Sequence, residues 1–359
     1  MAVSSTVRRG AKDFLSDGEK RCWVTDFTRI LVTGGAGFIG SAFVRRAVRA
    51  HPHWRIVVLD KLTYAGNLAN LAPVAEQITF HHGDITEPAD VQAAMAGADA
   101  VINFAAESHV DRALVDPRPC IRTNIEGVLV LLEIAQRSGV RRFLQVSSDE
   151  IYGDFCDIDR HAREDDALAP RNPYAASKAG SEHLAFSYAA SYGLDVVVTR
   201  GANTYGPYQY PEKIIPLFIT NALQDQPLPL YGDGMAVRDY LYVEDHAAGI
   251  DLVLHHGAAG TAYNLGARTA VTGVAVAAYI LEALGKPRSL MQYIADRPGH
   301  DYRYSVDPSR AEALGWTRAW DFVRGMAQTV AWYVAHADWW RAARAQTAFR
   351  EHETLWYAR

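Results

Sequence analysis

The chain has 359 residues, of which 49% are hydrophobic and 21% charged, and its formal net charge at pH 7 is −5. This length and composition can bury a large core and indicate a globular protein with one mid-sized domain and a smaller companion. Lys and Arg are scattered without a basic stripe, which argues against a nucleic-acid partner. Because no apolar run of about 20 residues and no signal-peptide core is present, we expect no membrane association.

Three cysteines, Cys22, Cys120 and Cys156, are spread widely along the chain. They are too few for a disulfide framework and too far apart for a CxxC-type metal site. Such cysteines are typical of a reducing compartment, so we expect a cytoplasmic protein with structural thiols and no metal in its functional site.

Residues 1–28 are polar and lack clear periodicity, so we interpret them as an extension outside the core fold. From residue 29 to residue 200, short apolar strands alternate with helical segments. Nearly all-apolar strands predict a parallel sheet covered on both faces, hence an α/β, doubly wound domain of the Rossmann type. The expected strands are 30–32, 56–59, 78–80, 100–102, 142–147 and 195–199, and helices are expected from about residues 39, 128 and 174.

Residues 201–359 differ in character, because several prolines and glycine-containing loops separate short elements. This pattern predicts a smaller, mixed substrate lobe. The segments 240–243 and 262–265 could each return a strand to either lobe. The Trp-rich stretch 327–340 predicts one amphipathic helix whose Trp332, Trp339 and Trp340 pack against the body of the protein.

Three glycines, Gly34, Gly37 and Gly40, follow the first strand and open a helix. Small residues at this spacing allow a sharp turn and a close approach to a pyrophosphate, which the helix N-terminus then binds. Asp60 ends the second strand, where a carboxylate would hold the ribose hydroxyls and repel a 2′-phosphate. We therefore predict NAD rather than NADP, although the adjacent Lys61 weakens that argument.

Asp84 and Ile85 follow the third strand, in position to meet the adenine edge. From the spacing alone, an ordinary turn aspartate explains this position equally well.

Tyr174 and Lys178 are four residues apart on a predicted helix and therefore share one face. A nearby ammonium group favours the phenolate, so Tyr174 is expected to act as a base at neutral pH. The preceding strand ends in Ser148, whose hydroxyl can converge on the same pocket.

Asp149 and Glu150 come directly after Ser148, at the carboxyl end of a strand, where open α/β sheets bind ligands. Oxidation at a sugar carbon needs only a tyrosine, a lysine and a hydroxyl. Elimination of water also needs a base for a C–H proton and an acid for the departing hydroxyl. The two adjacent carboxyl groups supply that pair.

With these motifs in place, the chain resembles the dTDP-glucose 4,6-dehydratase family of extended short-chain dehydrogenases from about residue 30 to residue 340. The acidic pair distinguishes these dehydratases from sister epimerases and decarboxylases, which usually lack it. The segments that carry the resemblance are 59–67, 105–111, 148–153, 174–178, 205–209, 237–243 and 297–301.

The resemblance implies a three-step conversion of dTDP-glucose, or a related nucleotide hexose, to the 4-keto-6-deoxy sugar. Tyr174 takes the C4 hydroxyl proton while hydride passes to NAD⁺, and Ser148 holds the C4 oxygen. Glu150 then removes the C5 proton as Asp149 protonates the departing C6 hydroxyl, and the hydride returns to C6.

The resemblance also implies further contacts and a homodimer that pairs through helices near residues 121–137 and 174–190. To the cofactor site it adds Phe38, Ile39, Lys61, Thr63 and Ala105. To the substrate site it adds His109, Asn203, Lys213, Arg238, Arg297 and His300.

Several positions depart from the family pattern. Asn103 stands where His is usual, Ser148 where Thr is commoner, and Gly273 where Asn is expected. Residues 201–204 read Gly-Ala-Asn-Thr in place of a more polar run. These changes leave the preferred hexose and nucleotide open. A nucleotide-sugar 4-epimerase or decarboxylase, or a non-catalytic NAD-binding protein on the same fold, remain the alternatives.

Overall fold

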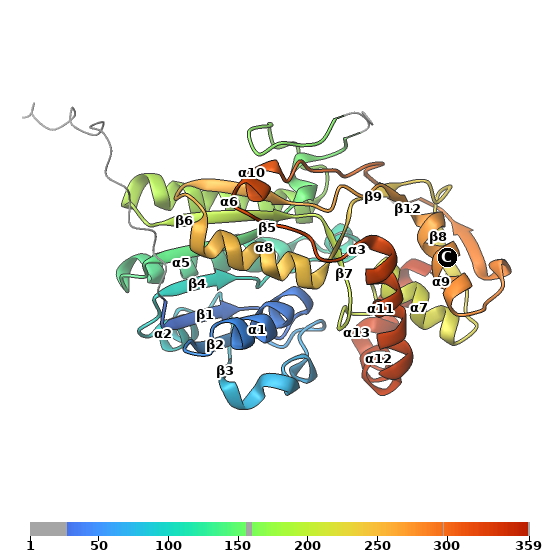
Figure 1. Cartoon of the computed structure of the whole chain (residues 1–359), viewed down its shortest axis with the longest axis horizontal. Coiled ribbons are helices and arrows are strands. Elements are labelled where there is room, and N and C mark those ends of the chain that lie inside the picture. The colour runs from blue at the N-terminus through green and yellow to red at the C-terminus, as the bar shows by residue number, and fades with distance from the viewer. Residues whose placement is uncertain (1–26, 156–159, 297, 358–359) are drawn as a thin grey trace, which may run out of the picture.

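The computed structural model describes residues 27–155, 160–296 and 298–357, except for the side chains of residues 352 and 355–357. Its centre is a parallel seven-stranded sheet with the strand order β11-β6-β5-β4-β1-β2-β3 (Figure 1). The middle strands are buried almost throughout, as expected for a sheet covered on both faces. The strands are β1 (Arg29–Thr33), β2 (Arg55–Asp60), β3 (Ile78–His82), β4 (Ala100–Asn103), β5 (Arg142–Ser148), β6 (Val196–Gly201) and β11 (Thr261–Leu265).

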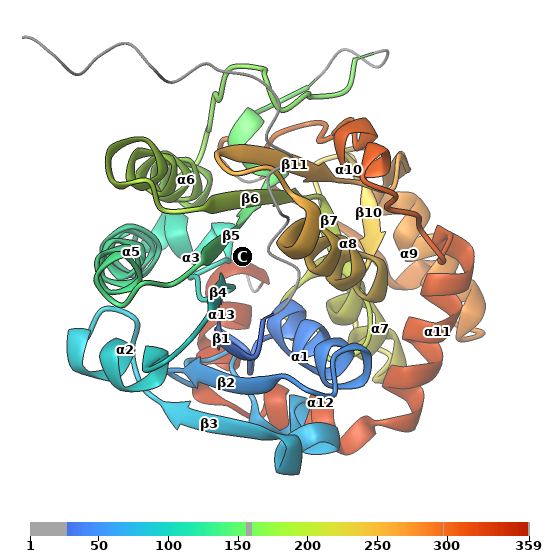
Figure 2. The same cartoon turned by 60° about the vertical axis from the view of Figure 1, so that its left-hand side comes forward.

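Helices cover both faces of this sheet (Figure 2). One face carries α2 (Pro88–Met95), α5 (Val128–Arg137) and α6 (Pro173–Tyr192), and the other carries α1 (Phe38–Ala50) and α8 (Val243–His256). Each face buries its own hydrophobic cluster, so the sheet separates two cores. The predicted doubly wound α/β fold is confirmed.

The second half of the chain contributes to both parts of the molecule. β11 completes the main sheet beside β6, whereas β10 (Tyr240–Tyr242) pairs with β7 (Asn203–Tyr205). The segment 262–265 therefore returns to the main sheet, whereas the segment 240–243 does not. The chain crosses between the two parts more than once. The other paired strands are β8 (Leu228–Tyr231) with β13 (Met291–Ile294) and β9 (Val237–Arg238) with β12 (Val271–Thr272).

A third hydrophobic cluster lies under five of the remaining helices, toward the right of Figure 1. It is built largely from aromatic and aliphatic side chains of the second half of the chain. The five helices are α7 (Ile214–Leu223), α9 (Gly273–Ala283), α11 (Phe322–Ala335), α12 (Ala337–Arg344) and α13 (Thr347–Tyr357), and the others are α3 (Val110–Val115), α4 (Arg118–Ile121) and α10 (Ser309–Ala313).

The Trp-rich stretch forms two helices rather than the single helix predicted over 327–340. α11 ends at Ala335 because His336 leaves the helical region, with φ −117° and ψ 47°. The His336 ring stacks on Trp332, and its Nδ1 lies 2.8 Å from the Trp332 carbonyl oxygen at the end of the helix. Trp332 and Trp340 are buried, and Trp339 donates to Asn70, so the predicted packing role of the tryptophans is confirmed.

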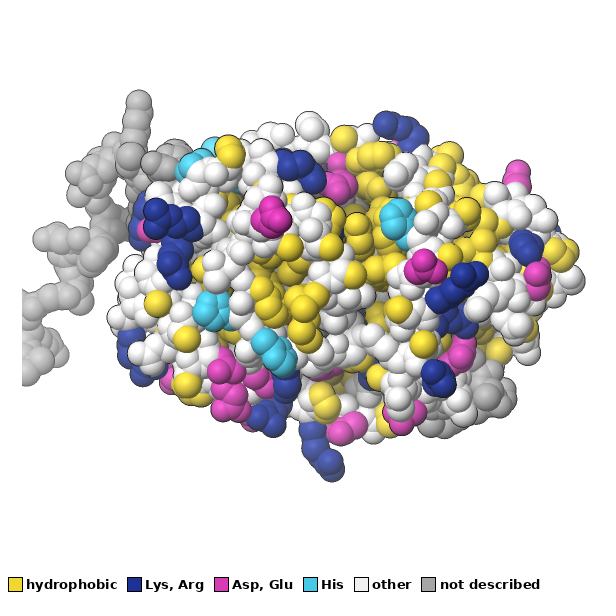
Figure 3. Space-filling view, turned by 90° about the horizontal axis from the view of Figure 1, so that it is seen from below, with side chains coloured by type: hydrophobic (Ala, Val, Ile, Leu, Met, Phe, Trp, Pro, Cys, Tyr) yellow, Lys and Arg dark blue, Asp and Glu magenta, His cyan; other side chains and the backbone are white. Residues whose placement is uncertain are grey.

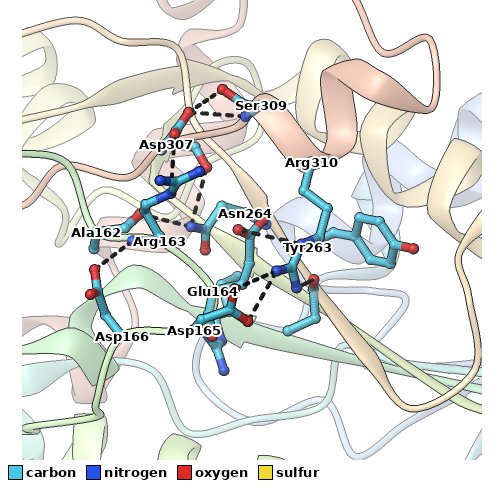
Figure 4. A network of polar contacts seen from close by, with 12 residues as sticks. Ala162, Arg163, Glu164, Asp165, Asp166, Tyr263, Asn264, Asp307, Ser309 and Arg310 are labelled. Atoms are coloured by element: carbon cyan, nitrogen blue, oxygen red, sulfur yellow. Dashed lines mark hydrogen bonds and ion pairs between the residues drawn. The ribbon is translucent and has the colours of Figure 1, made fainter.

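A polar network anchors the segment 160–166, which belongs to the connection between β5 and α6 (Figure 4). The Asn264 side chain on β11 donates to the Ala162 carbonyl oxygen at 2.9 Å, and its backbone N–H donates to the Glu164 carboxylate at 2.9 Å. The Arg310 Nη2 group donates to both carboxylate oxygens of Asp165, with both distances 3.0 Å. Since β5 and α6 carry the predicted catalytic residues, this network supports the loop that joins them.

Figure 3 shows one surface of the molecule, where acidic and basic side chains are interspersed around a central band of hydrophobic ones. Among the described residues, no helix combines the length and apolar character needed to cross a bilayer.

Candidate active site

The glycine loop between β1 and α1 forms a cradle that has no room for side chains. Gly34 has φ +68°, and a Cβ there would lie 2.5 Å from the Ala105 nitrogen. A Cβ on Gly40 would lie 2.3 Å from the Gly34 carbonyl oxygen. α1 begins at Phe38, and Gly37 before it offers no capping side chain, so the first-turn N–H groups face the loop without a side-chain acceptor. The loop therefore fits an anion at a helix N-terminus.

Asp60, at the end of β2, is buried beside this loop. Its carboxylate accepts hydrogen bonds from the backbone N–H groups of Ala36, at 2.9 Å, and Leu62, at 2.8 Å. Burial raises its pKa, and these hydrogen bonds oppose the rise. Lys61 does not neutralise Asp60, because its ammonium group lies 2.6 Å from the carboxylate of Asp84. The carboxylate next to the glycine loop thus remains available to hydroxyl donors.

The carboxyl end of β5 and the first turn of α6 bring the predicted catalytic residues together. Ser148 ends β5 and accepts a hydrogen bond from the Glu150 backbone N–H at 3.2 Å, which turns the chain into a short 3₁₀ helix. The Ser148 hydroxyl donates to the Asp149 carboxylate at 3.3 Å and lies close enough to the Tyr174 phenol to influence its pKa. Asn172, the N-cap of α6, donates to the Glu150 carboxylate at 3.3 Å. Local capping interactions therefore position both elements.

The pKa values of Tyr174 and Lys178 differ from those expected when a lysine lies beside a tyrosine. Burial, and then the nearby Glu150 carboxylate, raise the pKa of Tyr174. Burial lowers the pKa of Lys178 to about 8, and its ammonium group donates to the Val146 carbonyl oxygen at 2.5 Å. The expected lowering of the phenol pKa by the lysine is absent from this geometry, where burial is the dominant effect.

Asp149 is fully enclosed beside Glu150. Burial is the largest cause that raises the pKa of Asp149, followed by the charges of Glu150 and Asp239, while Arg238 opposes the rise. Its Oδ2 atom accepts no hydrogen bond from the described part of the chain. A pKa raised in this way favours the protonated form of Asp149, which can then serve as an acid.

All these groups open into one cleft with a cavity volume of about 290 Å³. Every predicted cofactor and catalytic residue lines it, as do three of the predicted substrate contacts. They are Gly34, Gly37, Phe38, Ile39, Gly40, Asp60, Lys61, Thr63, Asp84, Ile85, Ala105, Ser148, Asp149, Glu150, Tyr174, Lys178, Asn203 and Lys213.

Of the other predicted substrate contacts, Arg238, His300 and His109 lie outside the lining of this cleft. Arg238 and His300 are neighbours, with 3.0 Å between the guanidinium and the imidazole Nε2, and Arg238 is close enough to influence Asp149. His109 is buried at the start of α3. Arg297 lies outside the described residues. The substrate roles of all four stay predictions.

Further polar groups line the cleft that sequence reasoning did not single out. Glu212 is buried and pairs with Arg112 at 3.0 Å. Glu107 lies nearby, and burial, followed by the charge of Glu212, raises the pKa of Glu107. Both glutamates adjoin segments already singled out, so their neighbourhood was a usable signal. His246 enters the cleft from the first turn of α8, where no sequence motif marked it.

Comparisons with known proteins identify the relatives of this chain. The model of the NAD dependent epimerase/dehydratase family matches residues 30–266. A dTDP-glucose 4,6-dehydratase from Actinoplanes sp. is 47% identical over 321 residues, which cover 87% of this chain and 99% of that protein. The chain belongs to the dTDP-glucose 4,6-dehydratase family. The resemblance stated from the sequence motifs is thereby confirmed.

Solved structures agree with this membership. DesIV, a dTDP-glucose 4,6-dehydratase from Streptomyces venezuelae crystallised with NAD bound, matches with a TM-score of 0.86 and 46% identity, covering 88% of this chain and 100% of that one. A UDP-glucose 4-epimerase from Thermus thermophilus, also in complex with NAD, matches with a TM-score of 0.81 and 33% identity, over 86% and 100% of the chains. The fold is thus shared with epimerases, and the dehydratase is more similar in sequence.

The departures from the dehydratase family pattern have clear structural settings. Asn103 is buried between strands, where it accepts from Thr33 at 2.5 Å and donates to Gln145 at 2.9 Å. It therefore ties β1, β4 and β5 together beneath the cleft. Thr204 bonds the His246 imidazole at 2.7 Å on the cleft wall.

Gly273 begins α9 and does not line the cleft of this dehydratase family member. A Cβ at this position would lie 3.2 Å from the Gly234 carbonyl oxygen and near two aliphatic side chains, so a larger residue would need a small shift of its neighbours.

Proposed function

We propose that this chain is an NAD-dependent dTDP-glucose 4,6-dehydratase, a hydro-lyase that yields the 4-keto-6-deoxy sugar. The observation that carries the proposal is the placement of Asp149 and Glu150 beside Tyr174, in the same cleft as the glycine loop. The names of the relatives support the same reaction.

NAD fits the residues present, because the glycine cradle has no space for side chains and Asp60 offers a buried carboxylate beside it. Gly34, Gly37 and Gly40 would hold the pyrophosphate, Asp60 the adenosine ribose, and Asp84 with Ile85 the adenine edge. Phe38, Ile39, Thr63 and Ala105 complete the wall. When bound, NAD⁺ supplies the hydride acceptor for C4 and returns the hydride to C6.

The residues of the chain supply the proton transfers. Ser148 binds the C4 oxygen, and the Tyr174 phenol, which lies near Ser148, accepts the hydroxyl proton. Lys178 lies one turn further along α6, and we assign it, as the resemblance to the dehydratase family implies, to stabilising the phenolate that forms once substrate and NAD are bound. A keto group at C4 acidifies the C5–H bond, so Glu150 can remove that proton. Asp149, whose pKa burial raises, donates its proton to the departing C6 hydroxyl.

The substrate diphosphate requires cations and neutral donors on the other side of the cleft. Lys213 lines that side, and its ammonium group donates to the Ser108 carbonyl oxygen at 2.9 Å. Asn203 has a buried side-chain oxygen without a hydrogen-bond partner in the described residues, which suits a donor from a ligand. Arg238 and His300 form the next layer, and we assign them to the nucleotide diphosphate together with Lys213.

A homodimer in the cytoplasm is part of the same proposal. Ile121 is 41% exposed and Leu129 is 37% exposed, and both lie on the stretch expected to pair with a second copy. Burying such side chains in a dimer removes apolar surface from water. The reducing character expected from the cysteines supports the cytoplasmic location.

The test is to incubate the purified chain with dTDP-glucose, with UDP-glucose and CDP-glucose in parallel, and to follow products by mass spectrometry and NMR. Loss of one water to give the 4-keto-6-deoxy sugar is expected with dTDP-glucose. Glu150→Gln should lose elimination by about 10² to 10⁴-fold while bound NAD is still reduced by substrate. An interconverted hexose without loss of water would identify an epimerase, and unchanged substrate with all three nucleotides, with NAD demonstrably bound, would identify a binding protein.

A further inference from the structure

A cluster of His51, Asp251 and His255 lies outside the cleft. His51 is the C-cap residue of α1, and Asp251 and His255 lie one turn apart on α8. α1 begins at the glycine loop and has 13 residues, so about 20 Å of helix separates the cluster from the cofactor site. The proposed dehydratase chemistry makes no use of these residues.

The cluster has the spacing of a metal site. One nitrogen from each imidazole and one carboxylate oxygen lie within 4.8 Å of one another. Asp251 Oδ1 is 2.9 Å from His51 Nε2 and 3.5 Å from His255 Nδ1. A tetrahedral ion with bonds of about 2.1 Å has edges of about 3.4 Å between its ligand atoms. The two carboxylate–imidazole distances are close to this value, so small side-chain movements would set three corners of a tetrahedron, and water could occupy the fourth.

The surroundings hold the ligands in place. The His51 ring stacks on Trp54, with 3.9 Å between ring centroids, and Trp54 lies nearly parallel to His255 at 5.5 Å. Arg46 bonds the other carboxylate oxygen, Asp251 Oδ2, at 3.3 Å. Outer partners of this kind orient metal ligands. The three side chains are also only 9% to 19% exposed, so bulk water is mostly excluded while an ion can still enter.

We propose that His51, Asp251 and His255 bind a divalent transition-metal ion such as Zn²⁺, which fastens α1 to α8. Two imidazoles and one carboxylate favour Zn²⁺ over the oxygen-seeking Mg²⁺ or Ca²⁺. His255 Nδ1 also lies 2.8 Å from the Asp251 carbonyl oxygen. A proton held in that contact passes to solvent when the metal takes its place. Sequence patterns did not reveal the site, because 200 residues separate His51 from Asp251.

The experiment titrates Zn²⁺ into the full, untagged chain after treatment with a chelator, using calorimetry and thermal unfolding. Asp251→Asn and His51→Gln each remove one ligand atom. His256→Gln is the matched control, because His256 is exposed and adjoins the site without belonging to it. Circular dichroism verifies that each variant is folded.

We expect saturable binding of one ion and a higher unfolding temperature. The two ligand variants should weaken binding by about 10-fold or more, with the control within about twofold of the unaltered chain. Absence of saturable binding, or equal binding by all variants, would overturn the proposal. Co²⁺ provides a measurement independent of any variant: strong visible absorption of a four-coordinate ion supports the site, and the weak absorption of a six-coordinate ion contradicts it.

Discussion

The cofactor half and the substrate half of the cleft are built in different ways. The cofactor half consists mainly of backbone and of residues that lie close together in the chain, from Gly34 to Asp60. The substrate half gathers side chains from β5, α6, β7 and the segment before α7, and buried charge is concentrated there. The first half is specified by space and turn geometry, whereas the second depends on the electrostatics of groups that are distant in sequence. Variants of each half should therefore fail in different ways.

Tyr174→Phe is expected to have the largest effect. The variant removes only the phenol oxygen, so the overall dehydration rate should fall by about 10³-fold, which is about 4 kcal/mol in transition-state stabilisation. The amount of NAD that copurifies should not change, since the glycine cradle is intact. The two quantities are measured by product NMR and by NAD content after denaturation. A variant that lost NAD in parallel with activity would contradict the separation of the two halves.

Gly40→Ala breaks the cofactor half instead. The added Cβ would lie 2.3 Å from the Gly34 carbonyl oxygen, so the loop must move away from its pyrophosphate-binding shape. We expect NAD affinity, measured by calorimetry, to fall by about 10² or more, which corresponds to about 3 kcal/mol.

Gly180→Ala is the control for this prediction. It lies on α6, where the new methyl group meets only the flexible Ile125 side chain at 3.1 Å. Equal losses in both variants would show that the effect is one of general packing rather than of the cradle.

The sequence predicted the cofactor half well because each signal is local. Gly34, Gly37 and Gly40 meet within one turn, and Asp60 ends the next strand. In the substrate half, Tyr174 and Lys178 share one face of a helix, which is also a local signal. In the substrate half, local patterns found the residues next to the strand end but missed others. His246 reaches the cleft only because α8 packs against α1 and places it beside Gly201, where its ring would meet a Cβ at 2.4 Å.

Side-chain contacts also explain the other differences. The end of α11 depends on how His336 stacks on Trp332, and helical periodicity carries no information about that contact. Likewise, the pKa of Tyr174 reflects burial and Glu150 more than the neighbouring lysine, and burial is known only once the chain is folded.

Lys178→Met tests whether the buried ammonium group of Lys178, in the substrate half, lowers the free energy of unfolding. The folded-state pKa of Lys178 is about 8, below its usual 10.5, so the folded protein disfavours the charged form. The resulting cost grows as the pH falls from about 10 to 8 and is complete at pH 7. Allowing for the lost hydrogen bond to Val146, we expect the variant to gain about 2 kcal/mol in free energy of unfolding at pH 7 and to be inactive.

Urea unfolding measures this gain, which should shrink at pH 9.5 because the lysine is then largely neutral in the folded protein. A variant that is less stable than the unaltered chain at pH 7 would show that the ammonium group stabilises the fold.

The smallest effect is expected at His246, which tests the same principle at the position that sequence reasoning missed. Burial lowers the pKa of His246 to about 4, so between pH 6.5 and pH 4 the unfolded chain binds a proton that the folded chain does not. The free energy of unfolding should therefore decrease as the pH is lowered through this window.

His246→Asn removes the titrating group. The stability that this variant loses between pH 7.5 and pH 5.0 should therefore be smaller, by up to about 2 kcal/mol, than the stability that the unaltered chain loses. Thr204→Val, which removes only the hydroxyl that bonds the ring, keeps the histidine and should retain the full loss. Urea unfolding at the two pH values measures both variants. Equal losses of stability for His246→Asn and Thr204→Val would show that the acid sensitivity arises from groups other than His246.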